Sequence, residues 1–413
     1  GAHIPIPGIN GEALSAAFQG YQNTLLGLYN LFAGGAFEKA TLFALGIMPY
    51  ISASIIIIQL MSTVVPYFQR LQKEGEAGRK KITQVTRYLT VLISAMQAYG
   101  IVAVFLPSMS SGGQSVVINP GFSFIFTGTI CLITGTILLM WLGERITERG
   151  IGNGISLIIM IGIVSRLPNV VVGEIALVNE GVRSILSELI LLAVMLAVIC
   201  FVVLLTQGTR KIPVSYAKRV VGRKVYGGQS THIPLKVNTA GVMPIIFAQS
   251  IMFIPSTIAT FFSESNFMQT VMRWFSFDHP FYWIVFGLMI VFFTYFYTAI
   301  AFDPTQVSQQ MKQHGGFIPG IRPGKKTAEY IDNILSRVTL PGSFALAAVA
   351  VFPYILMQMM DVSYDLASFF GGTSLLIIVG VALDTLQQIE SHLMSRHYDG
   401  FLSKGKIRGR RRI

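Results

Sequence analysis

The sequence predicts an all-α polytopic membrane protein with about nine membrane-spanning helices. Only 12% of its 413 residues are charged and 52% are hydrophobic, and the mean hydropathy is +0.61. A soluble protein of this length could not cover its surface with so few charges. The same composition excludes a disordered chain and a secreted disulfide scaffold. Its two cysteines, Cys131 and Cys200, lie in long apolar runs, where buried thiols are expected.

The spans follow from the apolar runs, because a bilayer core requires about 20 apolar residues in a helix. Nine such stretches lie near residues 48–67, 87–107, 122–142, 154–172, 186–206, 241–262, 281–301, 341–360 and 372–392. An odd number of spans puts the two ends of this chain on opposite sides of the membrane.

The positive charge assigns the sides. Of the 31 lysines and arginines, 27 lie in the alternate segments 68–87, 143–152, 207–240, 302–340 and 393–413. The positive-inside rule makes this side, with its basic C-terminal tail 393–413, cytoplasmic. The first residues, up to Leu45, are then outside without a preceding signal peptide. We therefore expect one further helix before residue 1 and ten helices in the native protein.

Two of the basic loops, 207–240 and 302–340, are longer than the topology requires, and long loops are often functional. Alternating apolar residues around Gly227 and Gly228 predict a protruding hairpin. Pro213 and Pro234 would confine its strands to short or edge positions. These loops predict a docking surface for an acidic or RNA-rich cytoplasmic partner, whereas the rest of the charge sets topology and faces anionic lipid.

Two spans begin alike. Residues 46–55 read GIMPYISASI and residues 241–250 read GVMPIIFAQS, at an offset of 195. In the predicted topology the first helix runs inwards and the second outwards, as in an inverted repeat. The segment 32–46, FAGGAFEKATLFALG, is too short and polar to span. It predicts a short helix folded back into the outer face of the bundle, or an amphipathic interfacial helix.

Polar chemistry is sparse at membrane depth. Glu188, Asp384 and Glu390 lie at the ends of spans, and no histidine falls within the middle of one. There is no nucleotide-binding loop and no cluster with metal-ligand spacing. The sequence therefore predicts no enzyme and no cofactor. Uncharged polar residues of the two similar spans predict interhelical hydrogen bonds or a seam that can open; they include Gln59, Ser62, Gln249 and Ser250.

Five segments, in order, resemble the SecY family of protein-conducting channels. They are GIMPYISASI at 46–55, ERITERGIGNG at 144–154, QSTHIPLKVNTAGVMP at 229–244, GGFIPGIRPGKKT at 315–327 and GGTSLLI at 371–377. The resemblance implies a ten-helix channel made of two inverted pseudo-symmetric five-helix halves. Residues 1–172 would be the first half, 173–185 an external hinge loop and 186–392 the second half.

The family passes unfolded secretory polypeptides across the bacterial cytoplasmic membrane and releases hydrophobic segments sideways into lipid. By resemblance, its pore ring would be Ile51, Ile55, Ile155, Ile159, Ile246 and Ile377. Isoleucine is stiff at χ1, and an apolar constriction resists wetting and ions. The plug, about 32–45, would use Gly34, Gly35, Ala36, Ala40 and Ala44 to pack closely and leave easily. The lateral gate would set Gln59 and Ser62 against Gln249 and Ser250.

The resemblance also implies partners: SecE, SecG, the SecA ATPase, the ribosome, preproteins bearing signal peptides, and membrane lipid. Specific DNA binding is not expected. Arg322, Arg219, Arg223 and Lys224 would dock SecA carboxylates or ribosomal phosphates. The alternative is an inverted-repeat secondary transporter of a small solute. Ion coupling would then require mid-membrane carboxylates or unwound polar cages.

Overall fold

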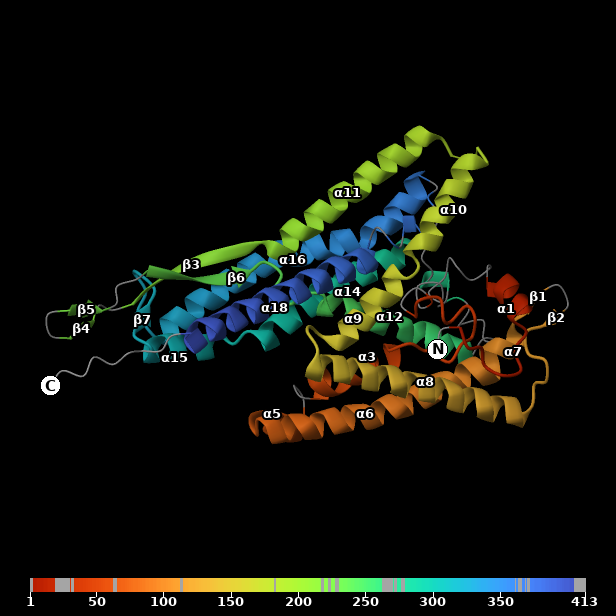
Figure 1. Cartoon of the computed structure of the whole chain (residues 1–413), viewed down its shortest axis with the longest axis horizontal. Coiled ribbons are helices and arrows are strands. Elements are labelled where there is room, and N and C mark those ends of the chain that lie inside the picture. The colour runs from red at the N-terminus through yellow and green to blue at the C-terminus, as the bar shows by residue number, and fades with distance from the viewer. Residues whose placement is uncertain are drawn as a thin grey trace.

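The computed structural model is an elongated, mostly helical molecule whose long helices run roughly along one axis (Figure 1). It describes residues 3–18, 30, 33–61, 65–111, 114–181, 183–216, 219–221, 224–226, 230–261, 270, 273–275, 279–360, 362, 366–367, 369 and 372–404. Within these residues, seven helices are long and apolar enough to cross a membrane, and two shorter apolar helices cover Met48–Ile57 and Met243–Met252. All nine predicted spans are therefore present as apolar helices.

The first half contains four of these spans and several short elements. Its helices are α1 (Gly11–Phe18), α3 (Met48–Ser54), α5 (Pro66–Lys73), α6 (Glu76–Tyr99), α7 (Leu106–Ser108), α8 (Phe122–Arg149), α9 (Gly154–Val164) and α10 (Leu167–Asn179). Two π-helical segments, η2 (Ile55–Met61) and η3 (Gly100–Phe105), continue α3 and α6. A short pair of strands, β1 (Ser110–Ser111) and β2 (Gln114–Ser115), follows α7.

The second half contains the other five spans. Its helices are α11 (Ile185–Gln207), α12 (Met243–Phe261), α14 (Pro280–Ala301), α15 (Pro304–Gln313), α16 (Lys325–Met360) and α18 (Gly372–Lys404). Its strands are β3 (Thr209–Tyr216), β4 (Arg219–Val221), β5 (Lys224–Tyr226), β6 (Ser230–Lys236) and β7 (Gly316–Phe317). Both α16 and α18 extend beyond the predicted spans, so each projects from the bundle.

The end of the bundle with β3 to β7 and α15 is called the basic end here, because the lysine- and arginine-rich loops 207–240 and 302–340 gather there (Figure 1). At the opposite end lie α1, β1, β2 and the link between α10 and α11 (Figure 1). This separation matches the two sides that the charge distribution predicts.

The two long basic loops form one unit, which we call the sheet platform: β3, β6, β7, α15 and the start of α16. β3 pairs with β6 over seven residues and with β7 only at Ser215 and Tyr216. A separate apolar core joins these elements, formed by Ile212, Val214, Leu235, Met311, Ile318 and Ile331. The platform is therefore a small folded body rather than two independent loops.

The predicted hairpin is confirmed, because β3 pairs with β6 and β4 pairs with β5 in a register that sets Val221 opposite Lys224. Gly227 and Gly228 lie outside the described residues. Pro234 lies on edge strand β6, and Pro213 lies on β3 where β7 does not pair. Both prolines therefore avoid the need for a second hydrogen-bonded neighbour.

The expected span 154–172 is divided into α9 and α10, which runs on to Asn179. Pro168 lies in the first turn of α10. Proline has no N–H group to continue a preceding helix, but it suits a helix start. Because residues 173–179 are helical, the link between α10 and α11 is shorter than the predicted loop 173–185.

Candidate functional site

The two short spans, α3 and α12, begin with the same backbone geometry. Gly46 and Gly241 have φ angles of 56° and 64°, in the left-handed region that glycine adopts without strain. In α3 the Ile51 N–H donates to the Ile47 oxygen (3.2 Å), and in α12 the Ile246 N–H donates to the Val242 oxygen (3.3 Å). These pairs stand at the same offset of 195 as the sequence repeat. The similarity predicted from sequence therefore extends to the three-dimensional start of both helices.

The six isoleucines of the predicted ring come from four helices: α3 with the start of η2, α9, α12 and α18. Ile51, Ile55, Ile159, Ile246 and Ile377 are buried in one apolar core that joins both halves, and Ile155 is half-buried against it. Among these helices, α3 contacts α12 and α9 contacts α18. The structure thus brings all six into one core built from both repeats.

The gate residues are only partly described. Gln249 and Ser250 of α12 are buried, at 1% and 4% exposure. The Ser250 hydroxyl donates to the Ile246 oxygen (2.8 Å), whereas neither amide atom of Gln249 has a well-formed hydrogen bond within the described residues, although the Tyr282 side chain lies close by. Burial of an amide without well-formed hydrogen bonds costs free energy. The packing of α12 at Gln249 is therefore weaker than packing in which every buried polar group has a hydrogen bond. Ser62 and the Gln59 side chain lie outside the described residues.

The plug segment is not the predicted helix. Residues 33–47 form successive turns, with an isolated bridge between Thr41 and Pro5. Positive φ angles at Gly34 (64°), Gly35 (80°) and Ala40 (40°) exclude a continuous right-handed helix. The prediction of a helix over 32–45 was therefore wrong, because these glycines serve reversals of the chain rather than helix packing.

The plug segment nevertheless packs tightly. Ala36, Ala40 and Ala44 are buried, at 0%, 3% and 2% exposure. A Cβ added at Gly34 would lie 3.3 Å from the Gly162 oxygen of α9. The Ile6 N–H donates to the Ala40 oxygen (3.0 Å) and the Leu42 N–H to the Ile4 oxygen (3.0 Å). The segment is thus held by the N-terminal residues at the end opposite to the basic end.

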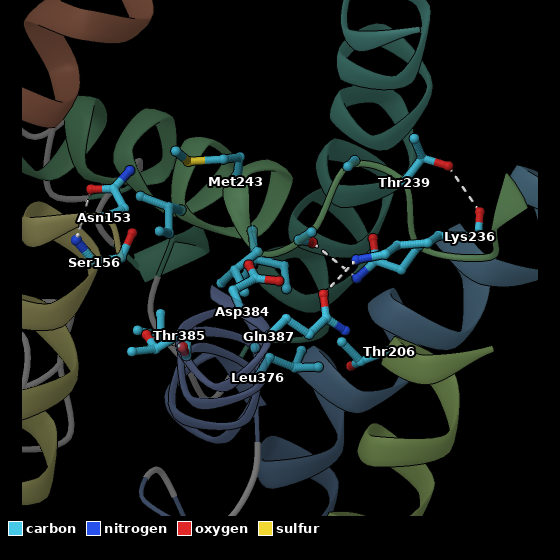
Figure 2. Close-up of a pocket in the computed structure, with 18 of the residues that line it drawn as sticks. Asn153, Ser156, Thr206, Lys236, Thr239, Met243, Leu376, Asp384, Thr385 and Gln387 are labelled. Carbon is cyan, nitrogen blue, oxygen red and sulfur yellow. Dashed lines mark hydrogen bonds between the residues drawn. The ribbon is translucent and has the colours of Figure 1, made fainter. Parts of the chain in front are cut away.

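A cavity of about 410 Å³ is lined by Lys236 of β6, by residues 238–242 and by parts of α9, α12 and α18, and it reaches the proposed ring residue Ile246. Figure 2 shows Asn153 and Ser156 of the first half on one side and Lys236 and Thr239 of the second half on the other, with residues of α18 between them. Its lining combines amide and hydroxyl side chains with about as many apolar residues and glycines, and Lys236 and Asp384 are its charged members. Such a mixed surface can contact water, peptide groups and apolar side chains.

The two halves meet at this cavity through consecutive glutamines of α18. Gln387 accepts a hydrogen bond from Lys236 Nζ (3.3 Å) in the second half. Gln388 accepts one from the Gly152 N–H (2.8 Å) in the first half. Sequence reasoning did not single out these residues or Asn153; the only available signal was a polar glutamine pair at the end of an apolar span.

Of the predicted docking residues, Arg322, Arg219 and Lys224 belong to the basic end. Arg322 is exposed in the turn between β7 and α16, where its backbone oxygen accepts a hydrogen bond from the Thr327 hydroxyl (3.0 Å). Arg219 and Lys224 are paired in register with other residues of β4 and β5, but the orientation of their side chains is not described. Arg223 lies outside the described residues. The structure therefore gives a defined surface only around Arg322.

Known proteins are similar to this chain in both sequence and architecture. The family profile described as SecY matches residues 41–386. The protein translocase subunit SecY of Escherichia coli (strain K12) is 46% identical over 412 residues, which cover 99% of this chain and 91% of that protein. The Haemophilus influenzae protein of the same name is 45% identical with the same coverage.

Solved structures agree in fold. A structure of a protein-conducting channel has a TM-score of 0.63 at 16% identity and covers 95% of both chains. Sec61 in the canine ribosome-channel complex from the endoplasmic reticulum has a TM-score of 0.57 at 15% identity, again covering 95% of both. The matching starts of α3 and α12 and the apolar core that joins them agree with this architecture. Because the family profile matches most of the chain and the two relatives match nearly all of it, this chain belongs to the SecY family.

Proposed function

We propose that this multi-pass membrane protein is the protein-conducting subunit of a translocation channel. It passes unfolded secretory polypeptides across the bacterial cytoplasmic membrane and releases hydrophobic segments sideways into lipid. The observation that carries this proposal is that three features adjoin one another. A cavity with a mixed polar and apolar lining reaches Ile246. Ile246 belongs to a core of isoleucines from both repeats, and the turns of residues 33–47 pack in the same core.

Each part supports one step. The cavity keeps an arriving chain hydrated, and the isoleucine ring, Ile51, Ile55, Ile155, Ile159, Ile246 and Ile377, closes around it without offering hydrogen bonds. The plug residues Gly34, Gly35, Ala36, Ala40 and Ala44 seal the resting pore. The gate opens between α3 and α12, where the buried Gln249 amide has no well-formed hydrogen bond within the described residues. Secondary transport is not supported, because the family profile and the close relatives are those of a protein translocase subunit.

The energy for transport comes from partners rather than from this chain. SecE and SecG would complete the membrane complex. SecA or a ribosome would dock on the sheet platform through Arg322 and the hairpin residues Arg219, Arg223 and Lys224. The basic end, with the C-terminal tail, would then face the cytoplasm, in accordance with the charge distribution.

A reconstitution tests the proposal. The full-length chain would be placed in liposomes with SecE, then supplied with SecA, ATP and a signal-bearing precursor before protease treatment. We expect protected precursor only with ATP and an intact signal. Absence of protection despite SecA binding would point to ribosome-coupled work or a further subunit, whereas absence of both would contradict the channel function.

A further inference from the structure

A short linker joins the sheet platform to the helix that carries half of the proposed gate. β6 ends at Lys236, and α12 begins at Met243. Because only residues 237–242 separate them, any movement of the platform must be taken up in this linker or passed to α12.

The linker is held by hydrogen bonds at several points. The Thr239 hydroxyl donates to the Lys236 oxygen (2.8 Å), as Figure 2 shows. The Asn238 amide donates to the Gly241 oxygen (3.0 Å), and the Val237 N–H donates to the Gly208 oxygen at the end of α11 (2.8 Å). These three hydrogen bonds resist stretching of the linker, because each broken bond costs free energy; Asn238 Oδ1 has no partner within the described residues.

Val237 is wedged between two glycines from neighbouring helices. A Cβ added at Gly208 would lie 3.2 Å from one Val237 methyl carbon, Cγ2. A Cβ added at Gly342 would lie 2.8 Å from the Val237 oxygen and 3.2 Å from its other methyl carbon, Cγ1. Gly342 directly follows Pro341 inside α16. Neither helix has room for a side chain on this face, so the valine fills the space between them.

The other end of the linker is equally constrained. A Cβ added at Gly380 of α18 would overlap the Val242 side chain. The Val242 oxygen in turn accepts the N–H groups of Ile245 (3.2 Å) and Ile246 (3.3 Å), which begin α12. The path from Val237 to the proposed ring residue Ile246 therefore contains no loose segment.

We propose that Val237, held between Gly208 and Gly342, is the positioning residue that couples movement of the sheet platform to α12. The inference rests on the proposed function, since it assigns the route by which a docked partner opens the pore. The platform moves as one body, Val237 serves as the fulcrum between α11 and α16, and α12 follows.

The first test separates coupling from docking. Val237→Gly removes both methyl contacts with the flanking glycines but keeps the backbone hydrogen bond. In the SecA-driven protection assay we expect about a tenfold loss of protected precursor, with SecA affinity and thermal midpoint close to wild type. Thr231→Gly is the matched control, because it puts the same flexible residue at an exposed position of β6, away from the linker, the cavity and the glycine contacts.

Three outcomes would overturn the inference: normal transport by Val237→Gly, an equal loss in Thr231→Gly, or a loss that parallels weaker SecA binding. The wild-type protein in the same assay reports on the proposed function itself. Failure of the wild type contradicts that function, whereas a normal wild type with a normal Val237→Gly variant contradicts only the coupling.

A second variant acts from the other side. Gly342→Ala should push the Val237 oxygen and displace α12, so the ion conductance of the partner-free channel in planar bilayers should rise several-fold. Gly287→Ala is its control, since a Cβ there would lie 3.8 and 3.9 Å from its neighbours, at ordinary contact distance. Equal conductance of the two variants would contradict the fulcrum.

Discussion

The helices α3 and α12 begin in the same way but are held from opposite ends of the molecule. Both start after a glycine with a positive φ angle and repeat the same first hydrogen bonds. The start of α3 is fixed by the turns of residues 33–47, which are bonded to residues 4–6. The start of α12 is fixed by the 237–242 linker and the sheet platform. One repeated element has thus acquired two different restraints.

The difference assigns separate roles to the two sides of the proposed gate. A partner at the basic end can reach the start of α12 through the platform. The start of α3 is instead restrained by the turns of residues 33–47. Variants that act on one restraint should therefore leave the other intact, and the transport, conductance and stability of such variants test whether the two restraints are independent.

The largest effect is expected from the platform side. Arg322→Glu reverses the charge of an exposed residue beside α16 and should abolish SecA-driven transport, because docking to acidic groups becomes repulsive. Precursor protection and SecA binding would be measured together. Lys312→Glu is the control, since Lys312 is an exposed cation on α15 of the same platform. Normal transport by Arg322→Glu, or an equal loss in the control, would remove the special role of Arg322.

The next effect concerns the ring, where the two repeats should be equivalent. Ile51→Gly and Ile246→Gly each remove a buried side chain from the apolar core and should raise resting ion conductance in planar bilayers. The double variant should conduct several-fold more than either single one, because the constriction loses both repeats. Ile161→Gly on α9 is the control, since that side chain is 61% exposed. Unchanged conductance in the double variant would exclude these residues from the seal.

A smaller, one-sided effect is expected at the plug. A Cβ at Gly135 of α8 would overlap the Leu42 backbone oxygen, so Gly135→Ala should destabilise the protein by about 1–3 kcal/mol. It should also displace residues 33–47 without weakening SecA binding. Thermal unfolding and accessibility of the plug segment to protease would be compared with Gly287→Ala. If the two alanine variants behave alike, the plug segment does not depend on close contact with α8.

The spans and their sides could be predicted because hydropathy and charge are properties of the chain alone. The ring isoleucines required the family resemblance, since nothing in an isolated apolar run distinguishes a pore-facing isoleucine from a lipid-facing one. The plug helix was mispredicted because glycine and alanine permit both helical packing and tight turns. The positive φ angles of Gly34, Gly35 and Ala40, which depend on their tertiary surroundings, separate these alternatives.

Ion pairs between distant residues escaped prediction for a similar reason. Arg87 of α6 makes a bidentate pair with Glu144 of α8, at 3.0 and 2.6 Å. Arg183 joins Glu174 (2.8 Å) and Glu188 (3.3 Å) across the link between α10 and α11. Each residue alone suggests a charge at a membrane interface. Their pairing depends on helix rotation, and the apolar pattern of these spans fixes rotation only weakly.

The smallest effect probes how firmly the platform must be built. Asp303 begins α15 by accepting hydrogen bonds from the Thr305 hydroxyl and from the N–H groups of Thr305 (2.8 Å) and Gln306 (3.3 Å). The hydrogen bond from the Thr305 side chain is the main reason that the pKa of the Asp303 carboxyl lies below its usual value. Loss of this cap in Asp303→Ala should cost about 1 kcal/mol.

The pH dependence gives this prediction its sign. Because the pKa is lowered in the folded state, the stabilisation is fully present above about pH 4, the ordinary carboxyl value, and is lost as the pH falls through the lowered pKa. The thermal midpoints of wild type and Asp303→Ala should therefore differ at pH 7 and converge at low pH. Asp303→Asn should keep most of the cap at both pH values, because its amide oxygen can still accept. If the platform acts on α12 alone, Asp303→Ala should slightly reduce SecA-driven transport. Added to Ile51→Gly, it should leave the resting ion conductance of that variant unchanged. A changed conductance would show that the restraints on α3 and α12 are not independent.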